Sequence, residues 1–446
     1  MKRYQRIIRL MAPSSSPHPA PGALAGVRVL EVAQVIAVPI CGLLLSDMGA
    51  EVIKLEPPTG DSFRHTQTAI VPGESKGFTV FNRGKRSICL DLTDPAGRGA
   101  ADRLIAAADV VLVSMKPSDI PRYGLTYEHC AEINPSVIYL EHIPLGDHGP
   151  FAGDGGYDVV VQGMSGLGAI SDRSSGEAPV YVRPAFSDAG TGMLSALGVV
   201  AALRHRDLTG EGQRVTTSLL HTSLALGANV LNWFAATDPP VWESVSEELA
   251  ALREQGAGYA GQRALYERRM FGGFGNIYFR HYRTADGFLS VGALSPAVNV
   301  RFRNVTGLDD PRTQPGFDAT SEDGRDQLLR LVDAAEALFR TRTTAQWIEV
   351  LRAGGVPCGP YHFPHEVFDE PQITENGFVA ELEHPVLGAY KTFSPPIRME
   401  RTPTAIQSPA PPLGADTEAI LAQAGFDDAA IQALIASGVA GARPLA

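Results

Sequence analysis

Short apolar segments alternate with helical stretches over the first third of this chain, and no other feature of the sequence constrains the fold as much. The apolar segments are five to seven residues long and rich in Val, Leu and Ile, which is typical of strands. Two successive strand-helix-strand units and one further strand predict an α/β fold with a doubly wound, mainly parallel sheet. The expected strands cover residues 26–32, 50–56, 87–92, 109–113 and 137–141, and the helices cover residues 40–48 and 95–108.

Helical segments dominate after Tyr157, and a β-hairpin is predicted around the turn Asp286-Gly287. We therefore expect a large domain, a second and smaller α+β domain, and a chain that returns from the second to the first. The expected helical stretches cover residues 158–167, 189–206, 326–338 and 344–353, a strand-to-helix passage covers 213–228, and the hairpin strands cover 275–282 and 287–292. The expected domains are a disordered extension over 1–22, the large α/β domain over 23–230, the small domain over 231–355, and a linker and C-terminal part over 356–446.

The charge of the chain limits its partners. Its 446 residues include 38 Lys and Arg against 49 Asp and Glu, a net charge of −11, so nucleic acid is not an expected partner. The four cysteines form no CxxC pair, which indicates a reducing, cytoplasmic compartment. The longest uncharged apolar stretches are shorter than a membrane span, and Arg9 interrupts what would have to be the apolar region of a signal peptide. No membrane association is expected.

Motifs of common cofactors are missing or out of context. One GxGxxG match, at residues 256–261, follows a predicted helix instead of the strand that a dinucleotide fold requires. The sequence has no Walker A, HExxH, GxSxG or EF-hand pattern, so no metal and no tightly bound cofactor is expected. His142 and His148 lie with Asp147 in a predicted loop, where they are either metal ligands or the polar rim of a pocket.

Asp188 is the carboxylate that the sequence singles out. It precedes an apolar, small-residue helix that we expect to start at Met193, which would make Asp188 the N-terminal cap. A capping carboxylate faces the positive end of the helix dipole, so we expect a lowered pKa and an ionised group. Such a group is either a plain cap or a nucleophile. Gly190 and Gly192 would let a bulky ligand approach the backbone.

Other residues could also take part in chemistry. Tyr157 either orients a reacting carbonyl or is a core or interface tyrosine, and Asp158 beside it is expected to be a helix N-cap. The glycines Gly272, Gly273 and Gly275 could form a loop that closes over a site, although a hairpin entry also uses glycine. Basic residues near the predicted strand ends are either phosphate contacts or a solvated face: Arg83, Lys85, Arg86, Lys116 and Arg122.

Several segments, in order and with ordinary spacing, resemble family III CoA-transferases, the group of formyl-CoA transferase and carnitine CoA-transferase. The resemblance runs from about Leu24 to the C-terminus, which makes it far more specific than any single motif. The matching segments are residues 24–32, 47–58, 82–87, 156–158, 209–213, 282–287, 356–360 and 412–414.

This resemblance implies a two-domain α/β subunit whose ring-like chain forms an interlocked homodimer, with an acyl-CoA and a small carboxylic acid as substrates. It implies that Asp188 attacks the acyl-CoA thioester, giving an aspartyl anhydride and then an aspartyl-CoA thioester. The residues that would position the substrate and its oxyanion are Tyr157, Gly272, Gly273 and Gly275. The CoA contacts of the family map to Val35, Ala37, Leu90, Ser114, Met115 and Arg122.

The chain departs from the family pattern in two loops. The usual Asn-Phe-x-Pro-Gly turn is Ser114-Met-Lys-Pro-Ser118, and the usual Ser-Gly-Phe-Gly loop is His142-Ile-Pro-Leu-Gly146. Two alternatives stay open, a 2-methylacyl-CoA racemase and a non-catalytic acyl-CoA-binding subunit of a heteromeric transferase. The racemases use the histidine of a Gly-His-Asp triplet where this chain has Tyr157, and a phenol of pKa about 10 is a poor base at neutral pH.

Overall fold

The computed structural model describes residues 21–66, 69–172, 176–271, 275–319 and 321–442. The chain divides into two compact units, each with its own hydrophobic core. The first unit contains Met1–Arg173, Val180–Asn232 and Gly377–Ala446, and the second contains Ser174–Pro179 and Trp233–Asn376.

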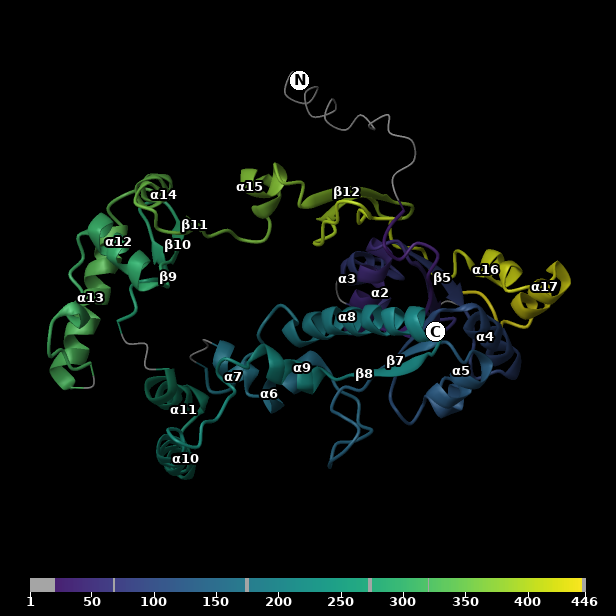
Figure 1. The fold of residues 1–446 in the computed structure, drawn as a ribbon, viewed down its shortest axis with the longest axis horizontal. Helices are drawn as coiled ribbons and strands as arrows, with labels where there is room; N and C mark the ends of the chain where they lie inside the picture. Colours follow the sequence, from purple (N-terminus) through teal and green to yellow (C-terminus); the bar gives the residue numbers. More distant parts are fainter. Residues whose placement is uncertain (1–20, 67–68, 173–175, 272–274, 320, 443–446) are drawn as a thin grey trace, which may run out of the picture. The chain divides into compact units, whose positions relative to one another are not determined.

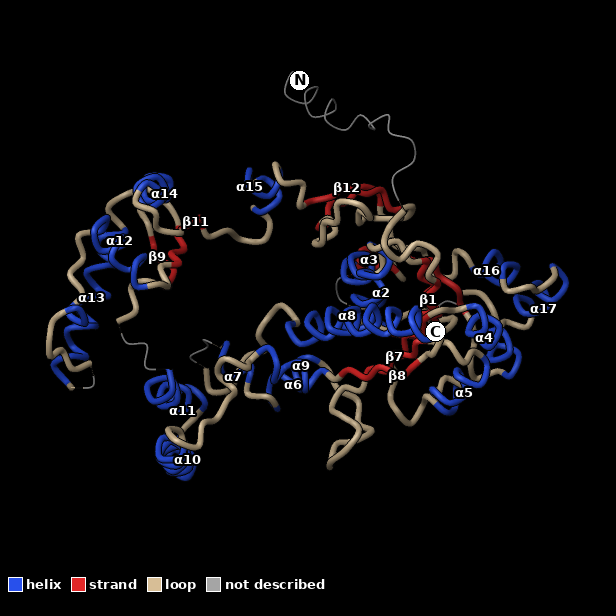
Figure 2. The backbone as a smooth tube through the Cα atoms, in the orientation of Figure 1, coloured by secondary structure: helices blue, strands red, loops and turns tan. Residues whose placement is uncertain are grey.

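A six-stranded sheet forms the centre of the first unit (Figures 1 and 2). All neighbouring strands are parallel, in the order β5-β2-β1-β6-β7-β8, so the first strand of the chain lies inside the sheet. This is the doubly wound topology, and the predicted α/β fold with a parallel sheet is confirmed. The strands are β1 (Arg28–Ala33), β2 (Glu51–Glu56), β5 (Lys85–Cys89), β6 (Val110–Ser114), β7 (Ile138–His142) and β8 (Gln213–Thr217).

Helices cover both faces of this sheet. One face packs against α2 (Ala37–Asp47) and α8 (Phe186–Thr209). Figure 1 shows the helices of the opposite face grouped together, α4 (Pro95–Ala107), α5 (Tyr127–Ile133), α16 (Thr417–Gln423) and α17 (Asp428–Ala436). Burial on both faces explains the nearly continuous apolar run of β6, whose sequence is Val-Val-Leu-Val-Ser.

The C-terminal segment returns to the sheet at its β5 edge. The Asp91 amide donates to the Val439 carbonyl at 2.8 Å, and the Ser87 amide donates to the Asp416 carboxylate at 2.9 Å. The other elements of the first unit are β3 (Ala69–Val71), β4 (Glu74–Ser75), α3 (Lys76–Phe81), α6 (Asp158–Met164), α7 (Leu167–Ser171), α9 (Leu219–Leu226), β12 (Val379–His384), β13 (Gly388–Phe393), and the 3-10 turns η1 (Ser62–His65) and η2 (Pro121–Tyr123).

Of the described helices, α8 is the one whose length and apolar composition would allow it to cross a membrane. Its residues Ala196, Val199, Ala202 and Leu203 lie in the core beneath the sheet, and its first half packs on α2 and α9. It is therefore a core helix of an α/β domain.

The second unit is built on a three-stranded antiparallel sheet in the order β11-β10-β9. The predicted hairpin is formed by β9 (Phe279–Arg283) and β10 (Phe288–Gly292), and β11 (Cys358–Pro360) adds to β10. Aromatic side chains fill its core, where Tyr282 stacks on Phe339 with ring centroids 4.0 Å apart. The helices are α10 (Pro239–Glu254), α11 (Tyr259–Tyr266), η3 (Glu267–Phe271), α12 (Pro296–Thr306), η4 (Pro311–Thr313), α13 (Glu322–Phe339), α14 (Thr344–Ala353), η5 (Val367–Asp369) and α15 (Pro371–Thr374).

Candidate active site

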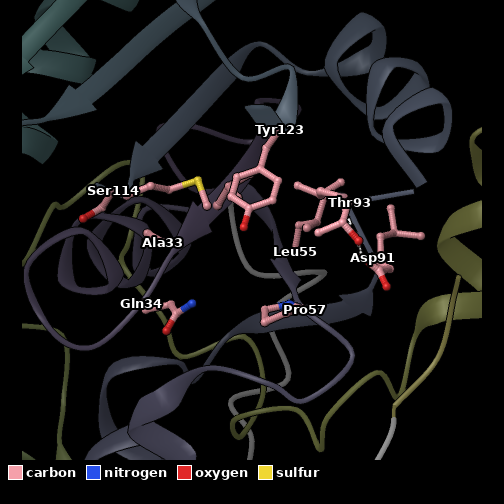
Figure 3. Close-up of a pocket in the computed structure, with 12 residues that line it drawn as sticks. Ala33, Gln34, Leu55, Pro57, Asp91, Thr93, Ser114 and Tyr123 are labelled. Atoms are coloured by element: carbon pink, nitrogen blue, oxygen red, sulfur yellow. Dashed lines mark hydrogen bonds between the residues drawn. The ribbon is translucent and has the colours of Figure 1, made fainter. Parts of the chain in front are cut away.

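Two cavities lie at the carboxyl ends of the strands of the first unit, beside the point between β1 and β6 where the strand order reverses. This is where open α/β sheets bind their ligands. The larger, which we call the Asp188 cavity, has a volume of about 480 Å³, and the smaller, the Leu90 cavity, has about 160 Å³. Gln34, Ser114, Met115 and Tyr123 line both. Figure 3 shows the Leu90 cavity, with Ser114 and Tyr123 on the side of β6.

Asp188 lies in the first turn of α8 and lines the larger cavity. The predicted N-cap position is wrong, because α8 begins at Phe186 and its N-cap is Ala185, which makes no side-chain cap bond. Gly190 and Gly192 do not open the backbone to a ligand as predicted. They allow neighbouring helices to pack closely. A Cβ at Gly192 would lie 2.4 Å from the Ala37 carbonyl oxygen of α2, and a Cβ at Gly190 would lie 3.0 Å from Thr222 of α9.

The pKa of Asp188 is raised to about 7, first by burial and then by the negative charge of Asp158. The sequence predicted a lowered pKa, because a helix N-terminus stabilises an anion. That prediction is wrong, since desolvation and a like charge outweigh the helix dipole here. No hydrogen bond within the described part of the chain contributes to the pKa of the Asp188 carboxyl group. The carboxyl group is therefore close to half ionised at neutral pH.

Asp158 holds the backbone of Asp188 in place. Its buried carboxylate accepts the Asp188 amide N–H at 3.0 Å and a hydrogen bond from the Gln162 side chain. Gln162 is fixed in turn by two hydrogen bonds to the backbone of Val182, of 2.9 and 3.2 Å. The prediction of Asp158 as an N-cap is wrong, because the cap of α6 is Tyr157 and Asp158 is its first residue. The sequence offered no signal for the contact with Asp188, which is made 30 residues away.

Two tyrosines, Tyr157 and Tyr181, are associated with the cavity or with the carboxyl groups of Asp158 and Asp188. Tyr157 lines the Asp188 cavity with a side chain that is 66% exposed. Burial, together with the charges of Asp158 and Asp188, raises the pKa of the Tyr181 phenol to about 12. Tyr181 is therefore protonated at neutral pH and can act only as a hydrogen-bond donor to the carboxylates.

Five of the six residues expected to contact CoA line one or both of these cavities. Val35 and Ala37 line the Asp188 cavity, Leu90 lines the smaller one, and Ser114 and Met115 line both. Arg122 lines neither, and its exposed guanidinium lies 5.6 Å from the centre of the Tyr123 ring.

The predicted glycine loop is described only in part. Gly272 and Gly273 lie outside the described residues. Gly275 belongs to the second unit and has a φ of 78°, a conformation that favours glycine. A Cβ there would lie 2.6 Å from Cβ of Leu328, so Gly275 also permits close packing within the second unit.

The backbone of Val35 is held in a rare conformation at the edge of the cavity. Its φ of 71° is unusual for a β-branched residue, and its N–H donates to the Asp61 carboxylate at 3.2 Å. Asp61 is itself paired with the buried Lys54 at 3.0 Å, which also contacts Glu31 at 3.1 Å. This buried charge network fixes the loop after β1, and no local pattern in the sequence indicates it.

Two of the basic residues named as possible phosphate contacts form ion pairs in the protein interior instead. Arg83 forms a buried ion pair with Asp47 at 2.6 Å, and Lys85 forms one with Glu31 at 2.8 Å, so neither is available to a ligand. Lys116 is exposed and lines the Asp188 cavity.

The prediction that His142 lies in a loop is wrong, because it is the last residue of β7. It lines the Asp188 cavity with only 4% of its surface exposed. Burial lowers the pKa of its imidazole to about 4, partly opposed by a hydrogen bond to the backbone of Thr217. His148 is exposed and binds Asp147 at 2.8 Å. The described residues contain no cluster of three or more His, Cys, Asp or Glu that could hold a metal ion.

Known proteins resemble this chain over almost its whole length. The description of CoA-transferase family III matches residues 24–417. The chain is 31% identical to a succinyl-CoA:glutarate CoA-transferase of Mus musculus, over 93% of this chain and 90% of that protein. It is 28% identical to a formyl-CoA:oxalate CoA-transferase of Streptomyces avermitilis, over 94% and 99% of the two chains. The crystal structure of a CAIB/BAIF family protein from Brucella suis superposes with a TM-score of 0.71 at 27% identity, over 91% and 100% of the two chains.

Proposed function

Because this chain belongs to CoA-transferase family III, we propose that it moves CoA from an acyl-CoA to a small carboxylic acid through covalent intermediates on Asp188. One observation carries the proposal. Asp188 presents a carboxyl group with a pKa of about 7 to a 480 Å³ cavity at the strand ends. A poorly solvated carboxylate with a raised pKa is a better nucleophile than a carboxylate that water or an ion pair stabilises.

The proposed reaction needs no net proton transfer. A carboxylate oxygen of Asp188 attacks the thioester carbonyl carbon, and the C–S bond breaks to give an aspartyl-acyl anhydride and the CoA thiolate. The thiolate then attacks the aspartyl carbonyl, which releases the first acid as its carboxylate and leaves an aspartyl-CoA thioester. The acceptor carboxylate attacks this thioester, forming a second anhydride and again the thiolate. Attack of the thiolate on the new acyl carbon yields the product acyl-CoA and frees Asp188.

Each tetrahedral intermediate carries a negative charge that needs hydrogen-bond donors. We assign this role to the glycine loop at Gly272, Gly273 and Gly275 and assign substrate orientation to Tyr157, on the resemblance to the family and, for Tyr157, on its place at the cavity. The α8 N-terminus adds the positive end of its dipole beside the reacting carbonyl.

We assign CoA to the two adjoining cavities. Five of the six expected contacts line them: Val35, Ala37, Leu90, Ser114 and Met115. The exposed Arg122 and Lys116 stand near the same strand end and could pair with the phosphates of CoA. CoA is on this proposal a substrate that arrives and leaves, and no tightly bound cofactor is required.

We also propose that the protein works in the cytoplasm as a homodimer. All four cysteines are free thiols, which suits a reducing compartment. The names of the relatives, which include glutarate and oxalate, support trying short dicarboxylates first as acceptors.

Replacement of Asp188 tests the proposal. We expect D188A and D188N to lose CoA transfer by about three orders of magnitude or more, as for other nucleophiles, while both still fold. In the wild type, hydroxylamine should trap an adduct on the peptide that contains Asp188, detectable by mass spectrometry. Asp119→Asn is the matched control, because Asp119 lines the same cavity but does not act on the pKa of Asp188.

Two outcomes would overturn the proposal. Transfer that survives in D188A would show that Asp188 is not the nucleophile. Exchange of the α-proton of a 2-methylacyl-CoA with solvent deuterium, without any transfer of CoA, would indicate a racemase. We expect no such exchange, because Tyr157 is a phenol and His142, with a pKa lowered to about 4, is a weak base.

A further inference from the structure

Val35, in the loop between β1 and α2, has a backbone conformation that glycine usually adopts. Among the described residues other than glycine, it is the one with a positive φ, at 71°. In this region the Cβ of an L-residue lies too close to the following carbonyl oxygen, and a β-branched residue is a genuine outlier there. Such a conformation persists only where neighbouring groups hold it, and it is common at ligand sites. The function proposed above uses Val35 as a CoA contact but does not account for its backbone.

The carboxylate of Asp61 holds this backbone. It is fully buried and accepts the Val35 N–H with both oxygens, at 3.2 and 3.3 Å. It also accepts the Phe63 N–H at 2.8 Å and lies 3.0 Å from Nζ of Lys54, which is buried as well. These two further partners fix the carboxylate, so it is a rigid acceptor for Val35.

Two more contacts bind the residues that precede Val35. Nζ of Lys54 donates to the Ala33 carbonyl at 2.7 Å, and the Gln34 side-chain oxygen accepts the Ser62 N–H at 3.2 Å. Three successive residues, 33–35, are therefore bound to β2 and to the loop that follows it. The conformation of Val35 is held by a segment that is distant in sequence.

Residues 33–37 form the wall where the two cavities adjoin. Ala33 and Gln34 line the Leu90 cavity, where Figure 3 labels them, and residues 34–37 line the Asp188 cavity. A change of φ at Val35 would turn the peptide groups on both sides of it. The shape of this wall therefore depends on the conformation that Asp61 holds.

A plain connection between a strand and a helix does not require this arrangement. The other described residues with a positive φ are glycines, which adopt it at little cost. Val35 instead places a larger residue at the Asp188 cavity, and its conformational cost is compensated by the bond to Asp61. A strained residue that a buried carboxylate holds at a cavity wall indicates that the shape of the wall matters to a ligand.

We propose that Asp61 is a positioning residue for CoA, whose buried carboxylate keeps Val35 in the left-handed conformation in which residues 34–37 form the wall that CoA contacts. This inference rests on the proposed function, which assigns CoA to the two cavities. Without the Asp61 carboxylate, Val35 relaxes to an ordinary conformation in most molecules. The affinity for CoA then falls in proportion to the fraction of molecules that keep the wall.

A double-mutant cycle tests this inference through the Kd of free CoA, measured by calorimetry, because free CoA has no acyl group to transfer. Asp61→Ala should raise this Kd by about 5- to 30-fold, the factor by which an L-residue favours leaving the left-handed region. In the Val35→Gly background, Asp61→Ala should raise Kd by less than about 2-fold, because glycine adopts both signs of φ about equally. In the Val35→Ala background, which also lacks the valine methyl groups but keeps Cβ, the rise should still be about 5-fold.

Two further measurements separate positioning from a general loss of stability. In Asp61→Ala, KM for an acyl-CoA should rise with the Kd of CoA, while kcat at saturation should fall by less than about 3-fold, because Asp61 itself lines neither cavity. Asp427→Ala is the control, since it removes the N-cap of α17 and Asp427 lines neither cavity. It should lower the melting temperature without changing Kd. Where Asp61→Ala does not fold, Asp61→Asn, which has nearly the same size but one acceptor oxygen, replaces it in the cycle.

The outcomes distinguish this inference from the proposed function. An equal rise of Kd in all three Val35 backgrounds, or no rise in any of them, would overturn the inference while transfer of CoA by the wild type would leave the proposed function intact. The expected cycle in a protein that transfers no CoA between acids would support the inference and overturn the transfer reaction. A wild type that binds no CoA would overturn both.

Discussion

At the scale of single residues, Asp188 shows how a helix N-terminus can hold a carboxyl group that is not fully ionised. The helix dipole favours an anion by about 0.3–1 kcal/mol at an exposed site, whereas a shift of one pKa unit corresponds to about 1.4 kcal/mol. The pKa rises to about 7 because burial and the charge of Asp158 together exceed the dipole. Asp158 therefore acts as a positioning residue in two ways, by accepting the Asp188 amide and by tuning its carboxyl group.

This balance predicts the pH dependence of activity. A nucleophilic carboxylate must be ionised, so kcat/KM of the wild type should fall as the pH decreases through about 7. In Asp158→Asn the like charge is gone, the pKa of Asp188 falls, and the acidic limb should move to lower pH by about one unit. Burial persists in the variant, so the limb should stay above pH 4. The profile is measured as kcat/KM between pH 5 and pH 9.

The control for this profile is again Asp119→Asn, because Asp119 lines the cavity without shifting the pKa of Asp188. Its kcat/KM can change, but the midpoint of its acidic limb should equal that of the wild type. An unshifted limb in Asp158→Asn would mean that another group controls the profile.

At the scale of secondary structure, the sequence predicted elements well where their signals are local. The helix expected over residues 344–353 is α14 with the same bounds, because Thr343 and Gln346 form a capping box. The start of α8 was missed because its N-cap, Ala185, carries no capping side chain. Gly190 and Gly192 lie inside α8 although glycine has a low helix propensity, because their missing side chains allow close packing against α9 and α2.

The residues of the candidate site were likewise predicted only in part. Asp188 could be proposed because its motif and its family resemblance are both readable along the chain. The contact of Asp158 with Asp188 could not be predicted, because only the folded chain brings these two residues together. The network of Glu31, Lys54 and Asp61 likewise joins residues that are distant in sequence.

The crossing of α8 and α2 gives a prediction on stability. A Cβ at Gly192 would lie 2.4 Å from the Ala37 carbonyl and 2.6 Å from Cβ of Ile40, so Gly192→Ala must push the helices apart. Overpacking of this kind costs about 1–3 kcal/mol, which exceeds the gain of up to about 1 kcal/mol from alanine in a helix. We expect a lower melting temperature by several degrees and weaker activity, since α8 also carries Asp188.

Gly99 in α4 provides the matched control, because no heavy atom lies within 4 Å of a Cβ built there. Gly99→Ala should therefore raise the melting temperature slightly, through the helix propensity of alanine alone. A Gly192→Ala protein as stable as the wild type would show that the two helices can separate at little cost.

At the scale of the whole molecule, the core helix α8 also carries several exposed apolar side chains. Met193, Leu194 and Leu197 are 56%, 44% and 65% exposed, and Val159 of α6 and Leu224 of α9 add to the exposed apolar surface of the first unit. Exposed apolar side chains in this number commonly accompany protein interfaces. This observation supports the homodimer that we propose.

The resemblance to the family implies that the proposed dimer is interlocked, and this form predicts how subunits exchange. Two surfaces that merely dock separate at their dissociation rate, so mixed populations form hybrid dimers without unfolding. Two ring-like chains that pass through one another cannot separate until at least one of them unfolds.

We therefore expect that unlabelled and isotope-labelled dimers, mixed under native conditions and followed by native mass spectrometry, remain unmixed for days. Unfolding and refolding the same mixture in denaturant should give hybrid dimers at the statistical ratio of 1:2:1 in the order unlabelled, hybrid and labelled, about half of all dimers being hybrid. Hybrids that appear within hours without denaturant would support a dimer of docked surfaces, and a monomer at micromolar concentration would contradict both forms.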